Sequence, residues 1–309
     1  MTLIPAPHPL DFDWRYDAGT IEALVPLLEH KKVLALGAPS VARRLQALGT
    51  DVTLVDRQPA QGVAAHLPRA VEDFVPAERY DAAIVDPPWY PDALERWAAV
   101  AAHAVGPGGL ILASVWPETA RPSAKLDLAL AISDIGQWAE VRRLDVPLAY
   151  LMPAFEERAI AASETAILAA SPCCGVLLEI RPHRLPARIA APQGDAWQRF
   201  LLDDYQLALR IGDADAQPLA ISRHPGAKGW HWPFVSARAP GREQIDLWSS
   251  AGEVALVSAP HVLRDHLRRA FAASNAAAFE RHLQAVPALL DWQIPRPPYR
   301  KYQEWRHLQ

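Results

Sequence analysis

Short apolar runs alternate with amphipathic stretches through the first half of the chain. Four apolar runs have the length and continuity of strands buried on both faces: 33–36, 52–55, 82–85 and 110–115. Between them, helical spacing of apolar residues predicts three helices: 21–30, 41–48 and 91–105. This alternation is typical of a parallel sheet with crossover helices. The sequence therefore predicts an α/β, Rossmann-like doubly wound sheet with its functional residues at the C-terminal ends of the strands.

The pattern changes after about residue 171. Segment 181–195 is rich in proline and arginine and is typical of a linker. Beyond it, shorter apolar runs predict strands at 199–211, 219–222, 232–237, 244–249 and 253–258, and helices at 261–273 and 275–290. We therefore expect two domains, 1–180 and 181–309, the second a smaller α+β accessory domain suited to substrate recognition.

Composition restricts the class of protein. The chain has 309 residues, of which 50% are hydrophobic and 21% charged, so it can build sizeable cores and is not of a disordered type. No apolar run has the length of a membrane span, and the N-terminus lacks the pattern of a secretory signal. The two cysteines, Cys173 and Cys174, exclude a disulfide framework, and we expect both to be small core residues. We expect a cytoplasmic protein.

Charge and aromatic residues are unevenly distributed. Residues 1–165 carry 14 Lys and Arg against 22 Asp and Glu, whereas residues 166–309 carry 17 against 13. A basic second half suits a polyanion, although an excess of this size is also ordinary. Trp230, Trp232 and Phe234 alternate as in a nucleic-acid groove or a core strand, and base rates favour the core. Nearby histidines lack a third ligand, so we expect no metal site.

Two residues at predicted strand ends suggest a nucleoside site. Gly37 ends the first apolar run, where a tight turn brings backbone amides and a helix N-terminus close to a ligand. Asp56 ends the second run, 19 residues later, where an acid can accept hydrogen bonds from ribose hydroxyls. This spacing suits NAD-type cofactors and S-adenosylmethionine alike. Without a glycine-rich turn, an ordinary strand end with a solvated aspartate explains it equally well.

The motif Asp86-Pro87-Pro88-Trp89 follows the third run and favours amine chemistry. The lone pair of a planar amine is conjugated into its ring, so the amine is a poor nucleophile. A carboxylate and a backbone carbonyl that accept its two hydrogens would turn that lone pair toward an electrophilic methyl group. Consecutive prolines remove N–H donors, and the adjacent indole can stack on a base. A plain strand-to-helix turn does not require all four residues.

These residues carry a resemblance. Asp-Pro-Pro followed by an aromatic residue is similar to the signature of class I S-adenosylmethionine-dependent methyltransferases that act on exocyclic amines of adenine, and the Trp form looks most like the messenger-RNA adenosine N6-methyltransferases. The turn Ala38-Pro39-Ser40-Val41 resembles the N6-adenine methyltransferase-like group, whose eukaryotic members methylate lysine on translation elongation factor 1A. Trp14-Arg15-Tyr16-Asp17 and, loosely, Phe155-Glu156-Glu157-Arg158 resemble the same group. The resemblance covers the first half of the chain.

The resemblance implies roles for individual residues. Asp86, Pro87, Pro88 and Trp89 would hold the substrate amine. The methionine part of S-adenosylmethionine would lie against the turn formed by Gly37, Ala38, Pro39 and Ser40, and Asp56 would hold the ribose. Asp73 is a candidate contact for the cofactor adenine, although a solvated loop acid explains it better. Trp14 and Tyr16 would either wall the pocket or staple the first helix to the sheet.

Two classes of function follow. The first is an S-adenosylmethionine-dependent N-methyltransferase, with adenine N6 in DNA or RNA as the preferred acceptor and protein lysine as the alternative. The second is a catalytically retired scaffold that binds a partner through residues 181–309. A nicotinamide dehydrogenase leaves Asp86 to Trp89 unexplained. No membrane or metal partner is expected.

Overall fold

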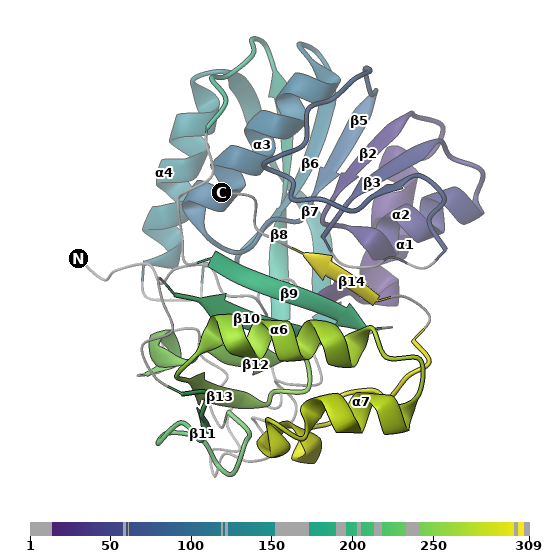
Figure 1. Cartoon of the computed structure of the whole chain (residues 1–309). Coiled ribbons are helices and arrows are strands. Elements are labelled where there is room, and N and C mark those ends of the chain that lie inside the picture. Colours follow the sequence, from purple (N-terminus) through teal and green to yellow (C-terminus); the bar gives the residue numbers. More distant parts are fainter. Residues whose placement is uncertain are drawn as a thin grey trace. The chain divides into compact units, whose positions relative to one another are not determined.

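The computed structural model describes residues 14–57, 60, 62–118, 120, 123–151, 173–189, 196–202, 205–212, 218–232, 241–299 and 302–305. The chain divides into two compact units (Figure 1). The first unit holds Trp14–Met152 and Pro172–Pro192, and the second holds Gln193–Gln309. The boundary expected after residue 180 falls within the last strand of the first unit.

The first unit is built on an eight-stranded sheet of order β1-β7-β8-β6-β5-β2-β3-β4. Its strands are β1 (Arg15–Tyr16), β2 (Val33–Leu36), β3 (Val52–Val55), β4 (His66–Leu67), β5 (Ala82–Val85), β6 (Leu110–Val115), β7 (Ala139–Leu151) and β8 (Cys173–Pro182). Strands β2 to β6 are parallel, and β8 is antiparallel to β6 and β7. The chain winds from β2 toward β4, then returns to β5 on the other side of β2. This reversal confirms the predicted Rossmann-like doubly wound class.

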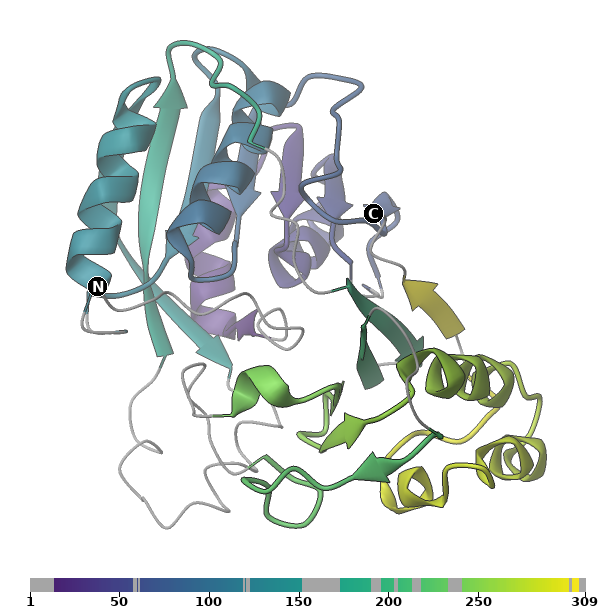
Figure 2. The same cartoon turned by 60° about the vertical axis from the view of Figure 1, so that its left-hand side comes forward.

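In the described part of the chain, four helices cover this sheet: α1 (Ala18–Leu28), α2 (Pro39–Ala47), α3 (Pro91–Val105) and α4 (Ala124–Gly136). Helices α1 and α2 pack together on one face, and α3 packs with α4 on the other (Figures 1 and 2). Helix α1 begins three residues before the predicted start because the Asp17 carboxylate caps it, accepting a hydrogen bond from the Thr20 N–H at 2.7 Å. Helix α2 begins at Pro39, whose fixed φ suits a first helical position.

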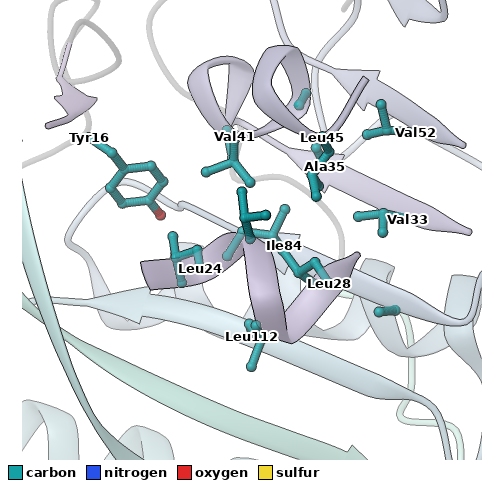
Figure 3. Close-up of a cluster of buried hydrophobic side chains, with 14 of the residues drawn as sticks. Tyr16, Leu24, Leu28, Val33, Ala35, Val41, Leu45, Val52, Ile84 and Leu112 are labelled. Carbon is teal, nitrogen blue, oxygen red and sulfur yellow. The ribbon is translucent and has the colours of Figure 1, made fainter. Parts of the chain in front are cut away.

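The apolar runs form the core because their alternate side chains reach opposite faces of the sheet. Figure 3 shows side chains of the inner strands meeting Leu24 and Leu28 of α1 and Val41 and Leu45 of α2. Ile84, at the middle of β5, is fully buried there. Predicted strands at 33–36, 52–55, 82–85 and 110–115 are all confirmed.

Strand β7 and helix α4 were not predicted. Strand β7 carries four charged residues among its thirteen and contains Pro147, and its pairing with β8 shifts register between Leu144 and Leu148. This irregularity removes the alternation by which a half-buried strand is recognised. The expectation that Cys174 is a core residue is wrong, because its side chain is exposed. It lies on the strand end that pairs with this irregular part of β7.

The second unit contains a six-stranded sheet of order β11-β13-β12-β10-β9-β14, with every described pairing antiparallel. Its elements are β9 (Ala196–Leu202), β10 (Tyr205–Ile211), β11 (Ile221–Ser222), a 3-10 helix (Arg242–Gln244), β12 (Leu247–Ser249), β13 (Val254–Val257), α6 (Pro260–Phe271), α7 (Ala276–Leu283), a 3-10 helix (Pro287–Asp291) and β14 (Tyr302–Trp305). The predicted second, smaller α+β unit is confirmed.

Three predictions for this unit need correction. The run 199–211 is a hairpin of β9 and β10, not one strand. The helix expected over 275–290 ends at Leu283, and a 3-10 helix starts at Pro287, which cannot continue the α-helical hydrogen bonding. Trp232 is buried in an aromatic cluster, as the core interpretation expects, but it lies outside any strand. Phe234 lies outside the described residues.

Within the described part of the chain, no helix is long and apolar enough to cross a membrane.

The first prediction concerns this core. Substituting Ile84, which is fully buried, by Ala should lower the free energy of unfolding by about 2–5 kcal/mol, because a cavity remains at the centre of the sheet. Leu126→Ala on α4 is the control, since Leu126 is 63% exposed and should change stability by less than about 0.5 kcal/mol. Denaturant unfolding measures both, and equal losses would contradict the assigned core.

Candidate active site

The turn after β2 is shaped by a glycine that nothing larger can replace. Gly37 has φ +68°, and a Cβ added to it would lie 2.6 Å from Cζ3 of Trp97 and 2.9 Å from the backbone oxygen of Asp86. Its N–H donates to the Val55 oxygen at 3.0 Å, which ties the turn to the end of β3. The turn leads directly into α2, whose first turn has no side-chain cap. Backbone N–H groups at such a helix start can bind a ligand.

Asp56 lies where β3 ends and is 8% exposed. Its backbone is fixed on both sides: its N–H donates to the Leu67 oxygen at 3.3 Å, and its oxygen lies 3.0 Å from Nε2 of His66. The charge of Asp56 contributes to raising the pKa of Asp86, so the two carboxyl groups lie within electrostatic reach of each other. The structure thus brings together Gly37, Asp56 and Asp86, which the sequence placed at three separate strand ends.

The Asp86-Pro87-Pro88-Trp89 segment leaves β5 beside this turn. The Asp86 N–H donates to the Leu36 oxygen at 3.0 Å, which continues the pairing of β5 with β2 by one residue. The Pro88 oxygen accepts a hydrogen bond from the Tyr90 N–H at 2.6 Å. The Pro88 carbonyl therefore closes the turn into α3.

The Asp86 carboxyl group is surrounded by hydroxyl groups from other strands. The Tyr150 hydroxyl, on β7, donates to Oδ1 of Asp86 at 2.8 Å. The Tyr16 hydroxyl, on β1, also interacts with Asp86 and forms a short hydrogen bond with the Ser114 hydroxyl on β6. Burial raises the pKa of Asp86 to about 7, against the lowering effect of both tyrosine hydroxyls and of the Arg15 charge.

The rings around Asp86 form one aromatic cluster, consisting of Trp14, Tyr16, Trp89 and Tyr150. Tyr150 is at its centre: its ring centroid lies 5.0 Å from that of Tyr16, 5.6 Å from that of Trp89 and 6.4 Å from that of Trp14. Trp14 and Trp89 meet Tyr150 edge-on and are only partly buried. Trp14 and Tyr16 thus lie beside the catalytic candidate, as well as packing on the core of the sheet.

Sequence analysis missed Tyr150 and Ser114. Ser114 lies within an otherwise apolar strand and is fully buried, and a polar residue at such a position was a usable signal. Tyr150 gave no signal, because it lies on the strand whose alternation is broken. Phe155 to Arg158 lie outside the described residues.

Asp73, the candidate adenine contact, is exposed, whereas its neighbour Glu72 turns inward. Oε1 of Glu72 accepts a hydrogen bond from Nε1 of Trp97 at 2.9 Å. Glu72, one residue before the predicted position, is therefore the acid of this loop that contacts Trp97, and the Trp97 ring in turn lies against Gly37. Among the described residues no cluster of three or more His, Cys, Asp or Glu side chains is arranged to hold a metal ion.

Comparison with known proteins finds similarity to solved structures. The branched-chain polyamine synthase C9 mutein of Thermus thermophilus, solved with N4-aminopropylspermidine and 5'-methylthioadenosine, is 17% identical, with 62% of this chain and 64% of that chain covered and a TM-score of 0.49. This chain thus spans less than two thirds of that protein's length. The 16S rRNA N2 G1207 methyltransferase RsmC of T. thermophilus, solved with AdoMet and guanosine, is 12% identical, with 72% and 55% covered and a TM-score of 0.35.

The N-methyltransferase NodS of Bradyrhizobium japonicum WM9, solved with S-adenosyl-l-homocysteine, is 16% identical, with 53% of this chain and 83% of that chain covered and a TM-score of 0.34. No model of a known protein family matches the sequence, and no curated protein matches it.

The second prediction concerns the loss of folding stability caused by the ionised Asp86 side chain. Because the pKa of Asp86 is higher in the folded chain than in the unfolded chain, its ionised form destabilises the fold above pH 7, and this cost disappears as the pH falls through 7 toward 4. Asp86→Asn should therefore raise the melting temperature by about 5 °C at pH 8.5 and change it little at pH 4. Thermal unfolding at both pH values measures this; a difference independent of pH would contradict the buried-carboxyl assignment.

The third prediction concerns Tyr150. Its hydroxyl donates to the ionised carboxyl group and so holds the pKa of Asp86 down. Tyr150→Phe should raise that pKa by about one unit, which carboxyl-carbon NMR titration of Asp86 would detect. Tyr80→Phe is the matched control, because the Tyr80 hydroxyl faces Glu78. A titration midpoint unchanged in Tyr150→Phe would show that the hydrogen bond is absent in solution.

Proposed function

We propose that the first unit is an S-adenosylmethionine-dependent N-methyltransferase. The observation that carries the proposal is the position of the Asp86 carboxyl group. The backbone N–H of Asp86 is hydrogen-bonded to the end of β2 next to the Gly37 turn, and the Asp86 carboxyl group is hydrogen-bonded to Tyr150, which packs against the partly exposed Trp14 and Trp89. This arrangement supports the binding of an amine acceptor and of the cofactor at the same edge of the sheet.

The residues at this edge fit S-adenosylmethionine. Contact of Gly37 with Trp97 and with the Asp86 backbone leaves no room for a side chain there, so the turn presents bare backbone. That turn and the uncapped start of α2 would hold the methionine part, and Asp56 would accept hydrogen bonds from the ribose hydroxyls. S-adenosylmethionine, when bound, supplies an electrophilic methyl group on a sulfonium.

The chain's own residues would prepare the amine. Because Tyr150 occupies Oδ1 of Asp86, Oδ2 would accept one hydrogen of a planar amine, and the Pro87 carbonyl would accept the other. These two contacts would turn the nitrogen lone pair out of conjugation with the ring and toward the methyl group. Transfer of that group would release a neutral thioether and leave an extra proton on the methylated nitrogen, and Asp86 would accept this proton. Orientation in a partly desolvated site supplies most of the rate.

Adenine N6 in DNA or RNA is the preferred acceptor. The partly buried Trp89 adjoins Asp86 and offers a flat apolar surface on which a base would stack. A neutral planar amine also needs no deprotonation before attack, whereas a lysine ammonium must first lose a proton. Protein lysine remains the alternative, supported by the Ala38-Pro39-Ser40 turn.

The fourth prediction tests transfer. The purified chain should incorporate labelled methyl groups from S-adenosylmethionine into adenine-containing oligonucleotides, and Asp86→Asn should lower the rate at least about 100-fold, because its side-chain amide cannot take up the product proton. Asp81→Asn is the control: Asp81 is exposed at the opposite end of β5.

Three outcomes separate the alternatives. Label in protein substrates but not in oligonucleotides would replace adenine by lysine. A wild-type rate of methyl transfer in Asp86→Asn would contradict the assignment of Asp86 as the catalytic residue. A folded protein that transfers nothing and takes up no S-adenosylmethionine would favour the retired scaffold, with its function in residues 181–309.

A further inference from the structure

Trp97 occupies a position that the proposed function does not use. It lies on α3 and is 4% exposed, and the edge of its six-membered ring lies against the α-carbon of Gly37, where an added Cβ would be 2.6 Å from Cζ3 and 2.9 Å from Cη2. The same glycine approaches the backbone oxygen of Asp86. The indole therefore packs against the turn proposed to bind the cofactor. A change in the orientation of the ring would shift that turn or remove a packing contact from it.

The orientation of the indole is fixed by a single acid. Oε1 of Glu72, in the loop between β4 and β5, accepts a hydrogen bond from Nε1 of Trp97 at 2.9 Å. A buried indole N–H without an acceptor costs free energy, so this hydrogen bond selects one ring orientation. The Glu72 side chain is 14% exposed and shielded from the competing water that weakens surface contacts.

Glu72 also contacts the end of the neighbouring strand. Its Oε2 lies 3.7 Å from Nη2 of Arg57, the residue after Asp56. One carboxylate thus links the residue next to the proposed ribose acceptor with the ring against the Gly37 turn. Loop 68–80, which carries Glu72, is itself anchored by Val71 and Phe74, both buried.

We infer that Glu72 is a positioning residue for the cofactor turn: it holds the Trp97 indole against Gly37 and the Arg57 side chain beside Asp56. This inference rests on the proposed function, because it assigns Glu72 to the binding of S-adenosylmethionine. Glu72 acts through Trp97 and Arg57, and the exposed Asp73 beside it has no part in this arrangement.

Calorimetric titration of the full chain with S-adenosylmethionine tests the inference. Glu72→Ala should weaken binding on the order of tenfold, because the indole loses its acceptor. Glu72→Gln should restore affinity to within about threefold of wild type, since an amide oxygen can still accept from the indole N–H. Glu78→Ala is the matched control: Glu78 belongs to the same loop, forms an exposed ion pair with Lys32, and should bind as wild type.

A second variant keeps the test decisive if Glu72→Ala does not fold. Trp97→Phe removes the N–H donor from the other side of the same hydrogen bond, so it should weaken binding on the order of tenfold while Glu72→Gln stays near wild type. Folded Trp97→Phe that binds S-adenosylmethionine as tightly as wild type would overturn the inference.

The possible outcomes distinguish failure of this inference from failure of the proposed function. Folded wild-type protein that gives no heat with S-adenosylmethionine overturns the proposed function. Wild-type protein that binds, with Glu72→Ala binding equally well, overturns only the role of Glu72. Loss of affinity for S-adenosylmethionine in Asp73→Ala but not in Glu72→Ala would also overturn the role of Glu72, and would show that Asp73 is the acid that supports cofactor binding.

Discussion

The candidate site depends on how closely the ends of β2 and β5 approach each other where the strand order reverses. Asp86 donates to the Leu36 oxygen, and the α-carbon of Gly37 lies against both the Asp86 backbone and the Trp97 ring. Any side chain at position 37 would push these segments apart. Because of this approach, the turn before α2 and Asp86 lie side by side at the carboxyl ends of β2 and β5, where the proposed methyl transfer would take place.

Asp86 is partly exposed as a residue, but desolvation of its carboxyl group at that point has a cost that nearby hydroxyl groups reduce. The Tyr150 hydroxyl of β7 donates to Asp86, and the Tyr16 hydroxyl of β1 also interacts with it and is hydrogen-bonded in turn to Ser114 of β6. They do not fully compensate for burial, since the pKa of Asp86 is raised to about 7. A carboxyl group with a pKa of about 7 is suited to accepting hydrogen bonds from an amine and then its proton. The same raised pKa lowers the stability of the fold above pH 7.

Much of this architecture could be predicted from the sequence, and the missed parts share a physical cause. The runs 33–36 and 82–85 are buried on both faces, so continuous apolar sequence identifies them. Asp86 and Gly37 follow those runs directly. Tyr150 and Glu72 could not be found in this way. Tyr150 lies on a strand with an irregular pattern and Glu72 lies in a loop, and the contact of each with the site joins residues far apart in the sequence. The hairpin at 199–211 was missed because only two residues of the sequence separate the apolar residues that end β9 from those that begin β10.

The most direct test of the account is a crystal structure of the chain with S-adenosylhomocysteine. The account predicts the amino-acid part against the Gly37 turn, the ribose hydroxyls on the Asp56 carboxylate and the sulfur toward Asp86. A ligand bound with none of these contacts, or no ligand at this edge of the sheet at saturating concentration, would contradict it.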